Sequence, residues 1–330
     1  MIPTISACTE TVGEQPYRLH IPGSLLRCES GLSFRPVTVD VMPLLWRYLS
    51  LEEGRTCDFS YGGLLIWAPL FDYEYAICND TLFIKGRLEG DMSKVAFSLP
   101  VGAMPLSDCV VLLRQWCEAH GEALRFSAIP EYALDAFKPL SPRAVRPLPD
   151  WADYLYPLEP LASLSGKKMA KKRNHVNKFE ATFPDHEFVP LTPSRIGDAR
   201  KLLEKIAPVD TGSLSGMESA ERRLCALTLD LMSGKKTELT GGILYAAGEA
   251  VAFTVGDTKG DTLFIHIEKA DRDIPGAYEA VNKYFAAFMS ARCPELRYIN
   301  REDDAGDPGL RRAKQSYHPT ALLAKYDIIF

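Results

Sequence analysis

The chain has 330 residues, of which 46% are hydrophobic and 25% charged, and its formal net charge is −5. This length fits two domains of roughly 150 residues each, and the composition excludes wholesale disorder. Because the net charge is negative, attraction to nucleic acid or to an anionic lipid surface would need a local basic patch.

The sequence argues against several protein classes. The eight cysteines include no C-x-x-C pair, so we expect neither a metal site nor a disulfide framework. The amino-terminal residues lack the basic start and apolar run of a secretory signal. No stretch approaches the ~18 apolar residues of a membrane span. We therefore expect a cytoplasmic protein without a transmembrane segment, which would meet a membrane only at its surface.

The first half, after an extension over residues 1–30, reads as one domain over 31–137. Apolar spacing and turn residues predict its elements in chain order. These are a helix over 39–53, strands over 73–78, 81–86 and 93–99, a helix over 107–120 and a strand over 124–129. Residues 138–165 then contain six prolines, which is typical of a linker.

The second half, residues 166–330, repeats that order. Phe34 and Phe188 each begin an F-x-P-x-T motif ahead of a predicted helix. Strands are expected over 242–247, 250–257 and 262–268, followed by a helix over 277–291 and a strand over 296–299. The shared order indicates a tandem duplication. It is the order of the GNAT acyltransferase fold, an α/β (α+β) class with mixed, mostly antiparallel sheets flanked by helices.

A basic segment opens the second half. It contains Lys167, Lys168, Lys171, Lys172, Arg173 and Lys178 with His175 and no acid. With Ser165 as a helix cap, i, i+4 spacing would place Lys167, Lys171 and His175 on one face. Like charges so spaced repel unless an anion lies against them, which favours a phosphate-bearing partner. A solvated helix face is the alternative.

The most distinctive stretch spans residues 298–319. Asp307 can cap a helix with Pro308 at its first position. A strand that enters a charged loop and then a cationic helix suits an anionic substrate. The residues that carry this prediction are Asn300, Arg301, Arg311, Lys314, Ser316 and Tyr317.

The motifs at 165–179 and 300–319 together resemble the C-terminal family of bacterial phosphatidylglycerol lysyltransferases. The resemblance implies two GNAT-like domains, related in fold to the Fem peptidyltransferases. In lysyltransferase members it implies transfer of an amino acid from aminoacyl-tRNA to a lipid head group. It also implies that Lys167, Lys168, Lys171, Lys172 and Arg173 form a basic arm, and that Asn300, Arg301, Arg311 and Lys314 face the acceptor or the tRNA end.

The loop over residues 272–277 departs from the acetyl-CoA pattern. GNAT enzymes hold pyrophosphate on R/Q-x-x-G-x-G/A, and this chain keeps Arg272 and Ala277 but has Pro275 in place of a glycine. One peptide N–H is lost there. The departure argues against acyl-CoA and favours an aminoacyl-tRNA donor, or none.

We therefore expect an acyl- or aminoacyltransferase whose second half carries the active site. The catalytic candidates are His266 or Glu268 as base, on one face of a strand, and Tyr317 as acid for the leaving group. Two alternatives remain open, namely a non-catalytic module that binds tRNA or anionic lipid, and a CoA-dependent N-acetyltransferase.

Overall fold

The computed structural model describes residues 31–88, 90–206, 216–234 and 237–330, and the expected extension over 1–30 lies outside these ranges. The helices of the first half are α1 (Met42–Leu49), α2 (Tyr61–Phe71), α3 (Leu106–His120) and α4 (Leu134–Phe137). Its strands are β1 (Arg35–Pro36), β2 (Glu74–Cys78), β3 (Thr81–Leu88), β4 (Asp91–Phe97), β5 (Val101–Gly102), β6 (Arg125–Pro130) and β7 (Ala144–Pro147).

The second part of the chain provides the remaining elements. Its helices are α5 (Leu158–Ser163), α6 (Ala170–Thr182), α7 (Ile196–Lys205), α8 (Gly216–Ser233), α9 (Ala277–Arg292) and α10 (Pro308–Gln315). Its strands are β8 (Asp153–Pro157), β9 (Glu187–Pro190), β10 (Thr240–Ala246), β11 (Glu249–Lys259), β12 (Thr262–Ala270), β13 (Tyr298–Asn300), β14 (Ala321–Leu323) and β15 (Lys325–Ile329).

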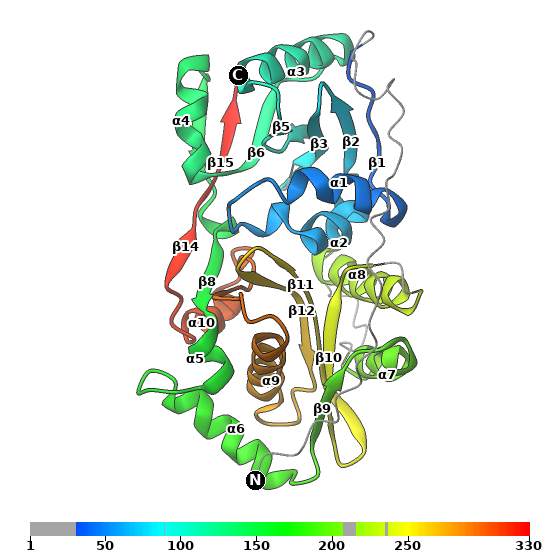
Figure 1. The fold of residues 1–330 in the computed structure, drawn as a ribbon, viewed down its shortest axis with the longest axis vertical. Coiled ribbons are helices and arrows are strands. Elements are labelled where there is room, and N and C mark those ends of the chain that lie inside the picture. The colour runs from blue at the N-terminus through cyan, green and yellow to red at the C-terminus, as the bar shows by residue number, and fades with distance from the viewer. Residues whose placement is uncertain (1–30, 89, 207–215, 235–236) are drawn as a thin grey trace.

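Two mixed sheets with helices between and outside them form the molecule (Figure 1). Residues of α1, α2, α7 and α8 share one apolar core, to which both sheets contribute. A second core joins α5, α6 and α9 to the other face of the second sheet, and a third joins α3 and α4 to the first sheet. The expected fold class, two similar units of mixed sheet flanked by helices, is confirmed.

The two sheets have the same strand order, and the first sheet takes one strand, β15, from the C-terminal end of the chain. The first sheet runs β1-β2-β3-β4-β6-β15-β7 and the second runs β9-β10-β11-β12-β13-β8-β14. In each, a meander is followed by one parallel pair, β4 with β6 and β12 with β13. β15 lies between β6 and β7 in the first sheet, and β8 lies between β13 and β14 in the second, so the chain passes from the second sheet to the first between β14 and β15 (Figure 1). This matching order supports the duplication.

The strand pairing crosses the domain boundaries that the sequence suggested. Residues 138–165 are not an open linker, because β7 pairs with β15 and β8 pairs with both β13 and β14. Their prolines fit this structure because Pro147 ends an edge strand, where the missing N–H is tolerated. The first sheet correspondingly extends to the C-terminal strand.

Two local differences from the expected elements have physical reasons. α2 was not expected, because it is apolar on all sides and contains Pro69, so it lacks the amphipathic pattern. α6 begins at Ala170 and not after Ser165, because Gly166 has a φ of +79° and interrupts a helix there. Within the described ranges, no helix is both long and apolar enough to cross a membrane.

Candidate functional site

The candidate site lies where two parallel strands of the second sheet part. β12 and β13 pair from Thr262 with Tyr298 to Phe264 with Asn300, and no further. Beyond that point side chains, not backbone groups, bridge the two segments. His266 contacts Glu302, and Glu268 contacts Arg301. The gap between the strands opens into a cavity of about 860 Å³ that both halves line.

The cavity has one apolar wall and one ionisable wall. The apolar wall comes mainly from α2 and its neighbours in the first half, and the ionisable wall from β12, α9, α10 and the loop after β13. Members of the apolar wall are Ile66, Trp67, Phe71, Leu88 and Leu224. Seven expected site residues line the cavity, namely Lys172, His266, Glu268, Arg272, Arg301, Lys314 and Tyr317.

Arg301 is held rigidly at the ionisable wall. Its backbone N–H donates to Tyr154 O at 3.1 Å, and its carbonyl accepts from Lys314 Nζ at 2.6 Å. Its guanidinium donates through Nη2 to Glu268 Oε1 at 2.7 Å. Burial opposes the charge of Arg301, but attraction to Glu268 raises its pKa above the ordinary value. Its buried Nη1 has no hydrogen-bond partner among the described residues.

Glu268 is fixed from two sides. Besides the guanidinium, it accepts at 3.0 Å from Nδ2 of Asn282, a fully buried residue of α9. Both oxygens of Glu268 are therefore engaged, one by a guanidinium and one by an amide. Glu268 therefore orients Arg301 in this geometry, and its base role stays a prediction.

Tyr317 lies between two cations. Lys172 Nζ is 4.1 Å from the centre of its ring and the Arg301 guanidinium carbon is 4.7 Å from it, distances at which cations are attracted to an aromatic face. Burial raises the pKa of Tyr317, so the hydroxyl is protonated at neutral pH. Lys172 Nζ lies 3.3 Å from Glu279 Oε1, and burial lowers the pKa of the lysine. Lys172 is the residue of the basic arm that reaches into the cavity.

The side chain of His266 is fully buried between two carboxylates. Nδ1 lies 2.7 Å from Glu302 Oε1 and Nε2 lies 2.9 Å from Asp257 Oδ2. Burial alone would lower the pKa of His266, but Asp257 and Glu302 raise it to about 10. Both ring nitrogens then carry protons, which favours a charged, orienting group over a base. Gly62 makes this contact possible, because a Cβ there would lie 2.4 Å from the ring.

Asp303 was not among the expected site residues. It follows Glu302 in the same loop and lines the cavity, and burial raises its pKa to about 7. The run Asn-Arg-Glu-Asp-Asp over residues 300–304 predicts a charged loop at this position. It could not tell which carboxyl group is desolvated, because that depends on packing.

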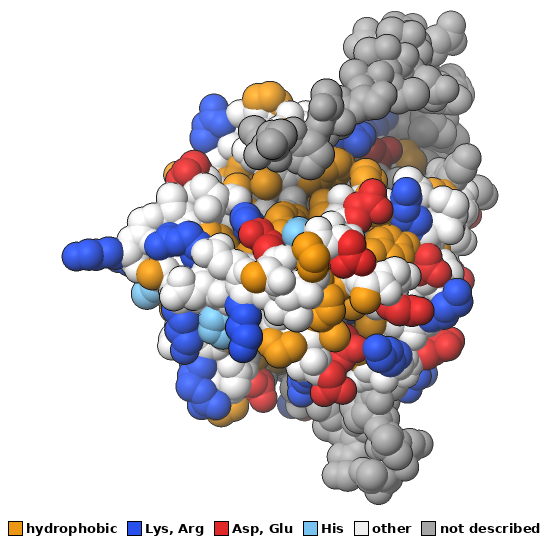
Figure 2. Space-filling view, turned by 90° about the horizontal axis from the view of Figure 1, so that it is seen from below, with side chains coloured by type: hydrophobic (Ala, Val, Ile, Leu, Met, Phe, Trp, Pro, Cys, Tyr) orange, Lys and Arg blue, Asp and Glu red, His pale blue; other side chains and the backbone are white. Residues whose placement is uncertain are grey.

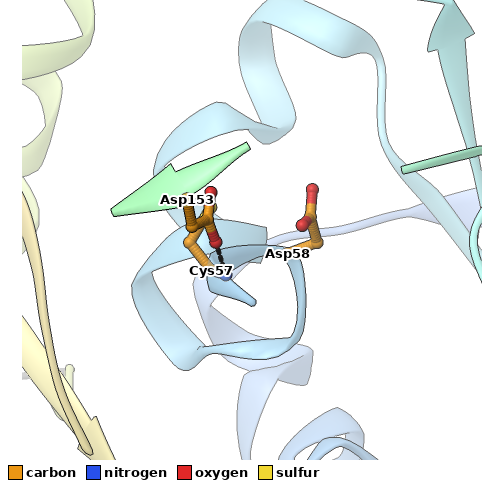
Figure 3. Close-up of side chains that lie close together, drawn as sticks. All are labelled: Cys57, Asp58 and Asp153. Atoms are coloured by element: carbon orange, nitrogen blue, oxygen red, sulfur yellow. Dashed lines mark hydrogen bonds between the residues drawn. The ribbon is translucent and has the colours of Figure 1, made fainter. Parts of the chain in front are cut away.

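Cys57, Asp58 and Asp153 gather where the two halves meet (Figure 3), close enough together to hold a metal ion. Asp153 Oδ2 accepts from the Cys57 backbone N–H at 2.6 Å. The Lys325 ammonium lies 2.7 Å from Asp58 and 2.8 Å from Asp153, so a cation of the chain already neutralises these carboxylates. Burial opposes that charge, yet Asp153 and Asp58 raise the pKa of Lys325. The donor set therefore fits an ion-paired junction better than a metal centre.

The exposed part of the basic segment forms a separate surface. Lys167, Lys168, Lys171 and Lys178 are exposed, and none has an ion-pair partner within the described ranges. Figure 2 shows Lys and Arg gathered on the left of the view, over α6 and the turn before it. Lys167 precedes the helix, so it does not continue the row of Lys171 and His175 as expected.

The remaining expected residues have structural partners or lie outside the cavity. Arg173 donates to Leu164 O, and Asn300 donates to Arg55 O and Asp153. Arg311 pairs with Asp304 and Asp150 near the rim, and Ser316 donates to Ala313 O. His175 is exposed, with Nδ1 3.6 Å from Glu279. Of the seven expected residues that line the cavity, Arg272 is exposed.

Residues 50–329 match the family described as phosphatidylglycerol lysyltransferase, C-terminal. The chain belongs to this family. Its structure is similar to that of a conserved protein of unknown function from Bacteroides thetaiotaomicron, with 31% identity, a TM-score of 0.84 and coverage of 91% of this chain and 99% of the other. The structure of L-PGS from Bacillus licheniformis shares the fold at 15% identity, with a TM-score of 0.58 over 91% and 93% of the two chains.

One curated relative is an uncharacterised protein from Mycoplasmoides gallisepticum, 25% identical over 182 residues. The match covers 53% of this chain and 54% of that protein, so the chain spans about half the length of the curated relative it matches. Membership of the phosphatidylglycerol lysyltransferase C-terminal family supports an acyl- or aminoacyltransferase kind. The resemblance read from the two sequence motifs is thereby confirmed.

Proposed function

We propose that the chain transfers an aminoacyl group from aminoacyl-tRNA to an acceptor that occupies the interdomain cavity. The observation that carries this proposal is the cavity itself, with rigidly held N–H donors on one wall and apolar side chains on the other. Acyl transfer needs directed donors near the reacting carbonyl. The apolar wall provides room for the hydrocarbon part of a lipid acceptor.

The basic face of α6 supports tRNA as the carrier of the donor group. Lys171 on this helix is exposed, whereas Lys172, the next residue, reaches into the cavity. A phosphate backbone bound along the helix would therefore bring its end close to the ionisable wall. The same face could contact an anionic lipid surface transiently.

The packing around α9 disfavours acyl-CoA as the donor. Gly276 precedes α9 with a φ of +88°, and a Cβ there would lie 2.6 Å from His175 O of α6. The basic helix thus lies against the loop that would hold pyrophosphate, and Pro275 removes one N–H from that loop. Calorimetry with acetyl-CoA tests this point, and clear micromolar binding would overturn it.

The proton-transfer groups are assigned within the cavity. Tyr317, protonated and half-enclosed by two cations, suits the expected acid role toward the leaving ribose oxygen. For the base, Asp303 has a pKa near neutrality, which matches a general base better than the paired Glu268 or the protonated His266.

The test is transfer of radiolabelled amino acid from a mixed aminoacyl-tRNA pool to extracted lipids. We expect labelled lipid with the wild-type protein and a large loss with Tyr317→Phe. Binding of tRNA without any transfer by the wild-type protein would favour the non-catalytic binding module.

Removal of the exposed charges tests the tRNA face separately. The double variant Lys167→Ala/Lys168→Ala should weaken tRNA binding and reduce its salt-dependence slope by about one to two. Lys138→Ala/Lys201→Ala removes the same charge from exposed positions elsewhere and should change neither. Equal effects of the two double variants would contradict a specific face.

A further inference from the structure

One nitrogen of the Arg301 guanidinium, Nη1, makes no hydrogen bond to any of the described residues. Nη2 is bonded to Glu268, the backbone N–H to Tyr154 and the backbone carbonyl to Lys314. Nη1 is buried and has no partner among the described residues, although the side chain lines the cavity. A buried donor without a partner destabilises the folded protein, so its retention at this position points to a ligand that supplies the missing acceptor.

The position of that donor is fixed before any ligand binds. Glu268 holds one edge of the guanidinium, and Asn282 in turn holds Glu268 at 3.0 Å. The Tyr317 ring lies 4.7 Å from the guanidinium carbon and the Tyr156 ring 6.0 Å. A donor held in this way needs no reorganisation when charge develops opposite it.

The local charge balance distinguishes two kinds of oxygen that Nη1 could meet. Arg301 is paired with Glu268, and Lys172 with Glu279, so these two pairs cancel in formal charge. A phosphate is charged in the ground state and is better matched by the unpaired lysines on the surface of α6. A carbonyl oxygen is neutral when bound and becomes negative only in the tetrahedral intermediate, which suits a directed donor without net charge.

We propose that Arg301 Nη1 donates to the carbonyl oxygen of the transferred acyl group and stabilises its oxyanion. This inference rests on the proposed function. An acceptor hydroxyl oxygen attacks the acyl carbon and loses its proton to a base. The intermediate then collapses, the bond to the tRNA ribose oxygen breaks, and that oxygen takes up a proton. Glu268 and Asn282 are positioning residues for Arg301 in this scheme.

The test compares transfer with binding of two adenosine analogues. A 3′-phosphonate analogue is a tetrahedral anion like the intermediate, and a 3′-aminoacylamino analogue is a planar amide like the ground state. Arg301→Gln should slow single-turnover transfer by about 10²–10³-fold and weaken phosphonate binding by a similar factor. Amide binding should change less than about threefold, because the ground state lacks the charge.

Variants control for folding and for general loss of charge. Arg301→Gln leaves Glu268 buried without its cation, so Arg301→Gln/Glu268→Gln removes both charges and should lose transfer equally. Arg312→Gln, an exposed arginine on α10, should match the wild type. Wild-type transfer by the double variant, or equal weakening of both analogues, would overturn the role of Arg301.

Failure of the proposed function gives a different result. If the wild-type protein transfers no amino acid, the proposed aminoacyl transfer is wrong. The binding measurements with the two analogues still test the role of Arg301. Phosphonate binding that depends on Arg301 would then support an oxyanion site, whereas no phosphonate binding by the wild type would overturn it.

Discussion

The two halves share one strand order but differ at the parallel pair in each sheet. In the first half, Phe97 of β4 lies opposite Phe126 of β6, and the Phe137 ring lies 5.0 Å from that of Phe126. In the second half, the strands part beyond Phe264 and Asn300, and ionisable side chains bridge the gap.

The energetics of the two places differ accordingly. A packed aromatic pair contributes about 0.5–1.5 kcal/mol beyond its buried area. A buried ion pair is often no more stabilising than apolar residues of similar volume. The charged cluster of the second half is therefore a poor way to stabilise a sheet. We infer that the parallel pair of the first half stabilises its sheet, whereas the ionisable side chains at the parallel pair of the second half are retained for the proposed function.

The largest effect should come from removing β15, the C-terminal strand that completes the first sheet. Truncation after Ala324 deletes β15, which lies between β6 and β7 and carries the fully buried Ile328. It also removes the Lys325 ammonium from Asp58 and Asp153. We expect no cooperative thermal transition by circular dichroism. Cooperative melting close to that of the wild type would show that the halves are independent.

Replacement of the buried histidine should have the next largest effect on stability. His266→Ala leaves Asp257 and Glu302 buried without their cation, which should cost about 3–5 kcal/mol in urea unfolding. His120→Ala, an exposed residue of the first half, is the matched control and should change little.

The raised pKa of His266 also predicts how the free energy of unfolding depends on pH. Its pKa of about 10 in the folded protein exceeds the model-peptide value of 6.5, so the folded state binds more protons between these values. Its contribution to stability is complete below about pH 6.5 and is lost as the pH rises to about 10. A free energy of unfolding that rises over this interval in the wild type, relative to His266→Ala, would contradict the ion-paired assignment.

Asp303→Asn tests the proposed role of the second half through its effect on the transfer rate. Because the pKa of Asp303 is about 7, wild-type transfer should rise as the pH increases through neutrality. The variant should be about 10²-fold slower and should lack this limb of the pH profile. It should also be more stable than the wild type at pH 8, because the raised pKa makes ionisation of Asp303 unfavourable in the folded state. Asp135→Asn, at an exposed position of the first half, should alter neither property.

The smallest effect should come from the aromatic core of the first half. Phe126→Leu should lower the free energy of unfolding by about 1–2 kcal/mol through imperfect packing. The transfer rate of the folded protein should not change, because Phe126 does not line the cavity. A lower transfer rate of the folded Phe126→Leu protein would show that the first half contributes to catalysis, and would contradict the comparison.

The sequence predicted most of the elements and the membership of the family. Alternation and turn residues located the strands of both meanders, and Asp307 with Pro308 predicted the start of α10, where Asp307 accepts from the Leu310 N–H. These features depend on neighbours within a few residues along the chain, so they can be read without a fold. The matching order of the two halves likewise predicted the duplication.

Only the tertiary structure decided which strands belong to which sheet and which side chains share a cavity. Glu268 and Arg301 were both expected at the site, but their pairing, and the free Nη1 it leaves, follow from the parting of β12 and β13. Residues far apart in sequence set these contacts, as do the burial of Asp303 and the two carboxylates around His266. Local patterns carry no information on such contacts, because desolvation and charge pairing depend on what packs against a residue.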